Sequence, residues 1–487
     1  MKFKNFRGIG IGLVAIIFAS SLVFIDTVAA QTNENIKWGK CRGGECGRLT
    51  VPLDDTVVGG PTISLSLSRV KARKPNKRVG ALVINPGGPG APGAAFALNF
   101  ASSLPAVIRD RFDIIGFDPR GVGDSAGVDC VDDFDALYAL NWAPSTDAQR
   151  TELENGFRGL AEACGKSDGQ NLPYLSTRRT ARDLDLIRAA LGEKRLTYLG
   201  YSYGTYLGAQ YADQFPQRVR ALVLDGGVDP GLESDEVGIQ QAAAFENSLN
   251  LFLQDCSKNS DCLFYQNGQS AVAYDALRSR IGAVPLAVKL NGERRKLNGT
   301  LFDIAISQIL YEGEQGWGTL AGALAAANDG DGEELLYYSD FYTGRLGKGK
   351  YDNLSESFFA VGCADGPTTI GVEDVRKMEA AAAIAAPRLG RSIVNNALVC
   401  AYWPAPAEPS VKLSAVGADK ILVIGTHDDP ATPLAWAKSL TDELGNAVLV
   451  TVAGSRHTAY ASGNTCVNRV VDRYLIYAKA PKPGINC

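Results

Sequence analysis

Ser202 has the setting in this chain that most favours nucleophilic chemistry. It is the centre of the sequence G-Y-S-Y-G at 200–204, which follows an apolar run at 196–199 and precedes a helical pattern at 205–215. A strand, a sharp turn and a helix in this order raise a serine hydroxyl above a sheet, and the two glycines leave room for the turn. The same pattern also occurs as a structural turn, so its function depends on whether the chain supplies a base and an acid.

The base that takes a serine proton is usually a histidine, and the chain has two, His427 and His457. Each follows a predicted strand. Where a serine lies on such a turn, the catalytic residues follow the chain order serine, acid, histidine. His457 comes after the acidic candidates and satisfies this order, so we predict that it is the base. His427 precedes them and is then a packed group beside the site.

The acid that orients the base is expected just after the apolar strand at 421–424. Asp428 and Asp429 both lie there, and we predict Asp429, because the proline that follows it biases it away from helical backbone angles. Asp428 and, more distantly, Asp225 remain alternatives. Outside the site, these carboxylates would be solvated in loops or would cap helices. The predicted set is a serine, a histidine and an aspartate that together activate the serine for attack on a carbonyl carbon.

The charge that develops on the attacked carbonyl oxygen needs two fixed backbone N–H groups. One is expected from Tyr203, the residue after the nucleophile, and the other from the loop N-P-G-G-P-G at 85–90. We predict Gly88 for the second oxyanion donor, because the two prolines have no N–H and glycine lets the backbone approach the substrate. A glycine-proline turn with no catalytic role is the alternative.

The elements that must position these residues alternate along the chain. Short, continuous apolar runs at 80–84, 112–117, 196–199 and 221–224 are typical of strands buried on both faces, and amphipathic helices such as 177–191 lie between them. This alternation predicts an α/β fold with a mainly parallel, doubly wound sheet whose strand ends carry the site.

Alanine-rich helical sequence then replaces the strands, until apolar runs return at 421–424 and 447–452. We therefore predict one sheet interrupted by a large, mostly helical lid insertion. The expected parts are a first core segment at 31–228, the lid at 229–415 and a second core segment at 416–487.

The first thirty residues predict export. Basic residues precede an apolar run at 9–25, and small residues at 28–30 offer a cleavage site before Gln31. We expect a cleavable signal peptide at 1–30 and a secreted or periplasmic protein, with an uncleaved single-span anchor as the alternative. The formal net charge of −4 and the lack of a basic block give no reason to expect nucleic acid or a stable membrane partner. The sequence does not indicate an oligomeric state.

Ten cysteines behind an export signal predict disulfides formed in an oxidising compartment. Spacing does not determine their connectivity, so we expect the pairing that closes the shortest loops. It joins Cys41 with Cys46, Cys130 with Cys164, Cys256 with Cys262, Cys363 with Cys400, and Cys466 with Cys487. No C-x-x-C motif occurs and the histidines are already assigned, so no metal or other cofactor is expected.

Several motifs together resemble a known family, the secreted tripeptidyl-aminopeptidase-like branch of the proline-iminopeptidase serine peptidases, which have the α/β-hydrolase fold. The match spans nearly the whole chain after the signal peptide. It rests on paired cysteines near the end and on five motifs in order: N-P-G-G-P-G at 85–90, D-P-R-G-V-G-D-S at 118–125, G-Y-S-Y-G-T at 200–205, L-D-G-G-V-D-P at 224–230 and D-P-A-T-P at 429–433. One departure is the pair Gly226-Gly227, where bulkier residues are expected.

The resemblance implies a serine exopeptidase that removes residues from peptide amino termini. It puts Ser202, Asp429 and His457 on the family's triad positions and supports Gly88 and Tyr203 as oxyanion donors.

An aminopeptidase must also recognise a free ammonium group, which needs a carboxylate. Glu312, Glu314 and Asp365 in the insertion are the candidates, although acidic side chains are more often simply solvated. A secreted carboxylesterase with the same triad is the first alternative function. A non-catalytic binding module of the same fold is the second.

Overall fold

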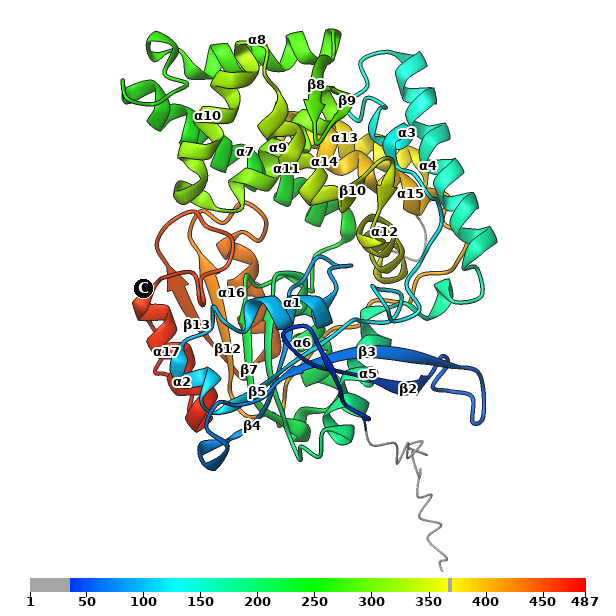
Figure 1. Ribbon diagram of the computed structural model, residues 1–487, viewed down its shortest axis with the longest axis vertical. Coiled ribbons are helices and arrows are strands. Elements are labelled where there is room, and N and C mark those ends of the chain that lie inside the picture. The colour runs from blue at the N-terminus through cyan, green and yellow to red at the C-terminus, as the bar shows by residue number, and fades with distance from the viewer. Residues whose placement is uncertain (1–35, 367–369) are drawn as a thin grey trace, which may run out of the picture. The chain divides into compact units, whose positions relative to one another are not determined.

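The computed structural model describes residues 36–366 and 370–487, so the predicted signal peptide lies outside the described part of the chain. Its main sheet has ten strands (Figure 1). Their order is β1 (Gly39–Cys41), β2 (Gly44–Pro52), β3 (Thr62–Val70), β5 (Phe112–Phe117), β4 (Gly80–Asn85), β6 (Leu196–Tyr201), β7 (Val219–Asp225), β12 (Ile421–Thr426), β13 (Ala447–Val452) and β14 (Ile485–Asn486). The pairs from β1 to β5 are antiparallel, and the pairs from β5 onward are parallel.

The parallel strands are nearly continuous apolar runs because helices cover both faces of the sheet. In β4, Ala81 and Val83 pack on one face, and Leu82 and Ile84 pack on the other. The first face is covered by α5 (Thr177–Ala190), α6 (Tyr203–Gln214) and α16 (Leu434–Leu444). The second is covered by α1 (Gly93–Phe100), α2 (Ala106–Arg109) and α17 (Thr465–Tyr477). The predicted doubly wound α/β-hydrolase fold is therefore confirmed.

Between β7 and β12 the chain is mainly helical. Two small hairpins interrupt the helices, β8 (Leu286–Leu290) with β9 (Glu293–Leu297) and β10 (Arg345–Gly347) with β11 (Lys350–Tyr351). The helices are α7 (Ser234–Lys258), α8 (Ser270–Ala283), α9 (Gly299–Leu310), α10 (Trp317–Asn328), α11 (Glu333–Thr343), α12 (Leu354–Asp365), α13 (Val372–Ala385), α14 (Gly390–Val394) and α15 (Leu398–Ala401). Across the two described ranges, no helix has the length and apolar character needed to cross a membrane.

A segment before the nucleophile also belongs to this helical layer. It contains α3 (Asp135–Tyr138) and α4 (Asp147–Ser167), which lie among the helices of the insertion in Figure 1. One hydrophobic cluster joins Phe157 of α4 to Phe302 and Phe359 of the insertion. The sequence pattern placed this segment in the first core part at 31–228. Its packing against the insertion depends on contacts between residues far apart in the chain, which the local pattern does not show.

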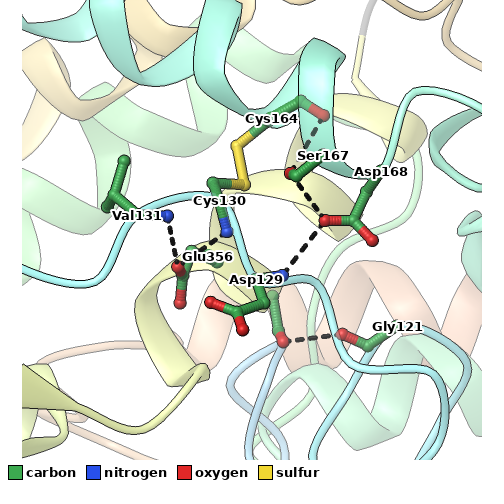
Figure 2. The surroundings of a disulfide bond; sticks show 9 residues. Gly121, Asp129, Cys130, Val131, Cys164, Ser167, Asp168 and Glu356 are labelled. Carbon is green, nitrogen blue, oxygen red and sulfur yellow. Dashed lines mark hydrogen bonds between the residues drawn. A yellow bond between two sulfur atoms is a disulfide. The ribbon is translucent and has the colours of Figure 1, made fainter.

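The Cys130–Cys164 disulfide ties the start of this segment to α4 (Figure 2). On its other side, Glu356 of α12 accepts hydrogen bonds from the backbone N–H groups of Cys130 at 3.0 Å and Val131 at 3.3 Å. Burial raises the pKa of Glu356 to about 7. A covalent bond and a buried carboxyl group thus hold the same loop.

The structure pairs all ten cysteines, and the predicted connectivity is confirmed. The shortest disulfide loops separate their cysteines by five and six residues, and the longest separates them by 37. The bonds are Cys41–Cys46, Cys130–Cys164, Cys256–Cys262, Cys363–Cys400 and Cys466–Cys487.

Candidate active site

Ser202 lies in the turn between β6 and α6, with φ +53° and ψ −125°. A positive φ is costly for a serine and persists only where the surrounding structure imposes it. The Ser202 N–H donates to the Asp225 carbonyl at 2.8 Å. Glycine is required at both ends of the turn, because a Cβ on Gly200 would lie 2.2 Å from the Gly204 carbonyl oxygen, and one on Gly204 would lie 2.8 Å from Asn85 Oδ1. The turn therefore holds the half-buried serine in one strained conformation.

Asp429 and His457 are brought together from the loops after β12 and β13. His457 Nδ1 lies 2.9 Å from Asp429 Oδ1 and 3.0 Å from Oδ2. The Asp429 carboxylate also accepts the backbone N–H groups of Ala431 at 2.9 Å and Thr432 at 2.8 Å, so its position is set by its own loop. Its side chain is fully buried, and that of His457 is 7% exposed.

The second imidazole nitrogen of His457 is free to react. Nε2 is buried and has no hydrogen-bond partner within residues 36–366 and 370–487. A buried nitrogen without a partner is uncommon in a native protein and calls for an explanation. Because Nδ1 faces a carboxylate, the neutral ring carries its proton on Nδ1 and presents a lone pair at Nε2.

The rival residues from the sequence have other positions. His427 and Asp428 are exposed at the surface of the β12 loop. Asp225, at the end of β7, is fully buried, and its carboxylate accepts the N–H groups of Ala459 at 3.0 Å and Tyr460 at 2.7 Å. Burial raises the pKa of Asp225 to about 6. Asp225 therefore holds the loop that follows His457 and does not contact the imidazole nitrogens.

The loop at 85–90 lies against Ser202. A Cβ on Gly87 would lie 3.0 Å from Ser202 Cβ, and the Gly87 N–H is already donated to Asn85 Oδ1 at 2.9 Å. In contrast, no acceptor within the described chain takes the N–H of Gly88 or that of Tyr203, the first residue of α6. These two free donors are the pair expected from the sequence.

Three residues beside His457 were not among those expected from the sequence. Gly226 leaves the space into which the imidazole fits, because a Cβ there would lie 3.2 Å from His457 Cε1. Thr432 Oγ1 lies 3.1 Å from Asp429 Oδ2 and 3.3 Å from His457 Nδ1. The Tyr311 carbonyl oxygen accepts the backbone N–H of His457 at 2.9 Å. The Tyr311 ring packs edge to face against the imidazole, with the ring centroids 5.0 Å apart. In the sequence, the unexpected glycine pair at 226–227 and the threonine of D-P-A-T-P were the features that could have pointed to Gly226 and Thr432.

The predicted ammonium-binding residues do not lie together. Glu312 and Glu314 are exposed and line a hollow beside the loop of His457, where Glu312 forms an ion pair with Arg456 at 2.7 Å. Asp365, at the end of α12, lines a separate cavity that Tyr203 also borders.

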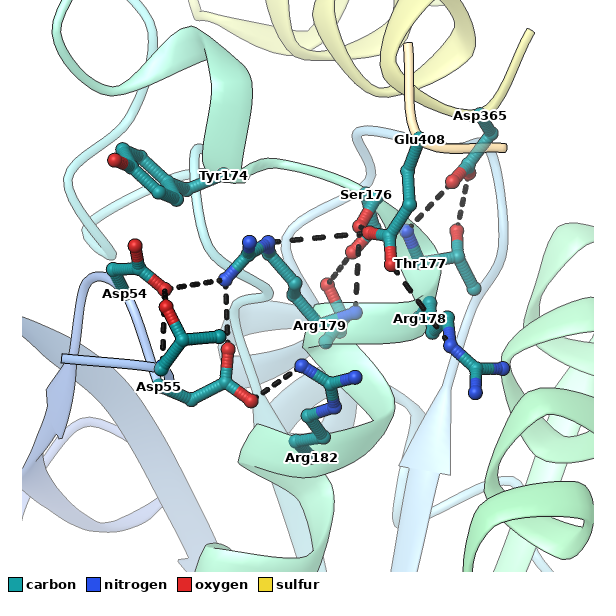
Figure 3. A network of polar contacts seen from close by, with 12 residues as sticks. Asp54, Asp55, Tyr174, Ser176, Thr177, Arg178, Arg179, Arg182, Asp365 and Glu408 are labelled. Carbon is teal, nitrogen blue, oxygen red and sulfur yellow. Dashed lines mark hydrogen bonds and ion pairs between the residues drawn. The ribbon is translucent and has the colours of Figure 1, made fainter. Parts of the chain in front are cut away.

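Asp365 is linked through Thr177 to Tyr203, in the turn that carries Ser202, and Figure 3 shows the Asp365–Thr177 contacts. Its carboxyl group accepts the Thr177 N–H at 2.7 Å and is hydrogen-bonded to the Thr177 hydroxyl. The same hydroxyl is hydrogen-bonded to the phenol of Tyr203. Burial raises the pKa of Asp365 to about 7. This chain of contacts restrains the side chain of a residue whose backbone N–H is a predicted oxyanion donor.

Comparisons with known proteins identify the family of this chain. A family model described as TAP-like protein matches residues 386–487, which include Asp429 and His457. The chain is 35% identical to "Serine protease Hip1" of Mycobacterium tuberculosis, over 94% of this chain and 92% of that protein. It is 34% identical to "Carboxylesterase B" of the same species, over 92% and 86%. It is 29% identical to "Tripeptidyl aminopeptidase" of Streptomyces lividans, over 94% and 88%. The chain therefore belongs to the TAP-like family of serine hydrolases with the α/β-hydrolase fold.

Proposed function

We propose that this protein is a serine exopeptidase that cleaves peptides from their amino terminus, with Ser202, His457 and Asp429 as its catalytic triad. The observation that carries the proposal is the His457 side chain, which is held by Asp429 at Nδ1 and has a buried Nε2 with no partner in the described chain. The strained turn at Ser202 supplies the nucleophile that such a base serves.

The chemistry follows from these positions. His457 Nε2 accepts the Ser202 proton as the serine oxygen attacks the carbonyl carbon of the substrate, and Asp429 stabilises the imidazolium that forms. The free N–H groups of Gly88 and Tyr203 bind the developing oxyanion. The imidazolium then protonates the leaving amine, which departs and leaves an acyl-enzyme. A water molecule, deprotonated by the same imidazole, releases the acyl group and restores the serine.

The peptide substrate is supported by the names of two relatives, a serine protease and a tripeptidyl aminopeptidase. A third relative is named a carboxylesterase, which supports the alternative function.

Three substrates of matched size separate the two functions: a tripeptide anilide with a free amino group, its N-acetyl counterpart and a short-chain ester. We expect the free-amino anilide to be cleaved fastest, and Ser202→Ala to lose both this activity and labelling by a fluorophosphonate. Fast cleavage of the ester alone would refute the peptidase function, and no labelling of the folded wild type would favour a binding module.

For the substrate ammonium group, we propose Asp365 ahead of Glu312 and Glu314. The cavity that Asp365 lines has a volume of about 320 Å³ and is also lined by Asp229 and Glu233, so its carboxyl groups attract a cation beside the turn of Ser202. Asp365→Asn should raise KM for the free-amino anilide and leave KM for the N-acetyl anilide unchanged. The double variant Glu312→Gln/Glu314→Gln is the matched control. If KM rose for that control and not for Asp365→Asn, the ammonium site would be at Glu312 and Glu314 instead of Asp365.

The disulfides point to an oxidising, extracellular location. We propose that residues 1–30 direct export and are then removed. Amino-terminal sequencing of the exported protein should begin at Gln31, and a chain that still begins at Met1 in the membrane fraction would show an anchor.

A further inference from the structure

A second cavity, with a volume of about 150 Å³, lies between the loop at 85–90 and the helical layer. Its wall is formed mainly by aromatic side chains, Tyr138, Trp142, Tyr311, Tyr342, Phe358 and Phe359. Of the described residues that line it, none is charged.

The cavity is bordered by one predicted oxyanion donor and by a residue that contacts the predicted base. Gly88, a predicted oxyanion donor, borders it together with Pro89. Tyr311 also borders it, and this residue contacts His457 through its ring and its carbonyl oxygen. A substrate carbonyl bound by the Gly88 N–H would therefore lie next to one wall of this cavity.

The polar groups of the most buried rings are already used. The Tyr138 hydroxyl is hydrogen-bonded to Ser355 Oγ at 2.8 Å, and the Trp142 indole N–H donates to the Leu137 carbonyl at 3.2 Å. A charged side chain entering the cavity would lose its water and find no partner of opposite charge. An apolar side chain would instead exchange water for contact with aromatic rings.

We propose that this cavity is the specificity pocket for the residue whose carbonyl Ser202 attacks, and that it selects a large apolar side chain, aromatic or branched aliphatic. The inference rests on the proposed peptidase function and names its substrate class. The carboxyl groups around Asp365 and this aromatic cavity meet at Pro89, which lines both. The preferred substrate is then a peptide with a free ammonium group and an apolar residue at the cleaved bond.

The first test measures kcat/KM for free-amino tripeptide anilides that differ only in the residue before the anilide. Phenylalanine and leucine should exceed alanine by about tenfold or more, and aspartate should fall at least about tenfold below alanine. Peptide substrates with a fixed residue before the cut and varied residues after it form the second series. Rates that follow the residue after the cut, or that do not vary at all, overturn the proposal.

Two variants connect the preference to the cavity. Ile304→Trp adds a ring to the wall and should reduce the ratio of kcat/KM for phenylalanine substrates to that for alanine substrates about tenfold. Phe358→Ala enlarges the cavity and should favour a naphthylalanine substrate over phenylalanine. The control is Val272→Trp on α8, where the side chain is 64% exposed and lies outside the cavity. An unchanged ratio in both cavity variants, or the same change in the control, refutes the assignment.

Esters keep this test separate from the peptidase proposal. If no peptide is cleaved but nitrophenyl esters are, the peptidase function fails, and the pocket is then judged by the acyl group alone. A phenylpropionyl ester should still exceed an acetyl ester in kcat/KM, and Ile304→Trp should still reduce that ratio. Equal rates for the two esters, or hydrolysis of neither substrate class, overturn the pocket.

Discussion

Replacing Gly226 with alanine should impair the base His457 while the protein still folds. Gly226 has φ +74°, where an L-residue costs about 1–2 kcal/mol. The added Cβ would lie 3.2 Å from His457 Cε1, 3.1 Å from Thr432 Oγ1 and 3.1 Å from Thr458 Cγ2. Carbon atoms in contact rest about 3.5–4.0 Å apart, so the imidazole must move by roughly 0.5 Å.

A displacement of this size has a predictable effect on the reaction rate. Moving a catalytic group by about 1 Å lowers a rate about 100-fold, so a movement of half that distance corresponds to about tenfold. This loss equals about 1.4 kcal/mol in activation free energy. Both Ser202 acylation by a fluorophosphonate and kcat/KM for the best substrate should fall by this factor, since both need the His457 base.

Gly445→Ala is the control for the backbone cost of placing alanine at a positive φ. Gly445 has φ +67° at the end of α16, and nothing in the described chain lies within 4 Å of an added Cβ. Urea unfolding should show a destabilisation of about 1–2 kcal/mol in both variants, and only Gly226→Ala should lose activity. Equal labelling rates in the two variants would refute the argument that the space at Gly226 positions His457.

Three further predictions concern stability. Burial raises the pKa of Asp225 to about 6, so the folded protein holds this proton more tightly than the unfolded chain does. This stabilisation of the wild type is complete below about pH 4 and is lost as the pH rises through the folded-state pKa. Asp225→Asn does not titrate, so its free energy of unfolding relative to the wild type should increase by about 3 kcal/mol from about pH 4 to pH 7, measured by urea unfolding. A constant difference across these pH values would contradict this. Arg120 forms a buried ion pair with Asp183 at 2.7 Å, and Arg120→Ala should cost about 3–5 kcal/mol, whereas Arg120→Met/Asp183→Asn should recover most of it. Replacing Cys363 and Cys400, which are 37 residues apart, with serine should cost about 4 kcal/mol in the same assay.

Patterns within short stretches of the sequence were sufficient for several features. Strands buried on both faces are continuous apolar runs, so the β4, β5, β6 and β12 strands were recognisable from their residue types alone. Short loops made neighbouring cysteines the natural partners, and all five disulfides follow that rule. Chain order was enough to prefer His457 over His427, and the structure places the latter at the exposed surface.

Features that depend on packing between distant segments were not accessible in this way. The helices α3 and α4 lie with the insertion because their apolar faces fit helices more than a hundred residues further along the chain. Asp365 was expected to bind substrate. Its hydrogen bond to Thr177, which in turn contacts Tyr203, became visible only when α12 was placed beside α5.

The active site shows the same division. Residue types and their order along the chain selected Ser202 and His457 and favoured Asp429 over Asp428 and Asp225, because activating a serine needs a base and an acid and the chain has few histidines. Only the tertiary structure decided that Asp429 and not Asp428 meets His457, that Asp225 holds the loop after it, and that Gly226 leaves room for its ring. These roles depend on how strands that are far apart in sequence pack together, which no local sequence pattern specifies.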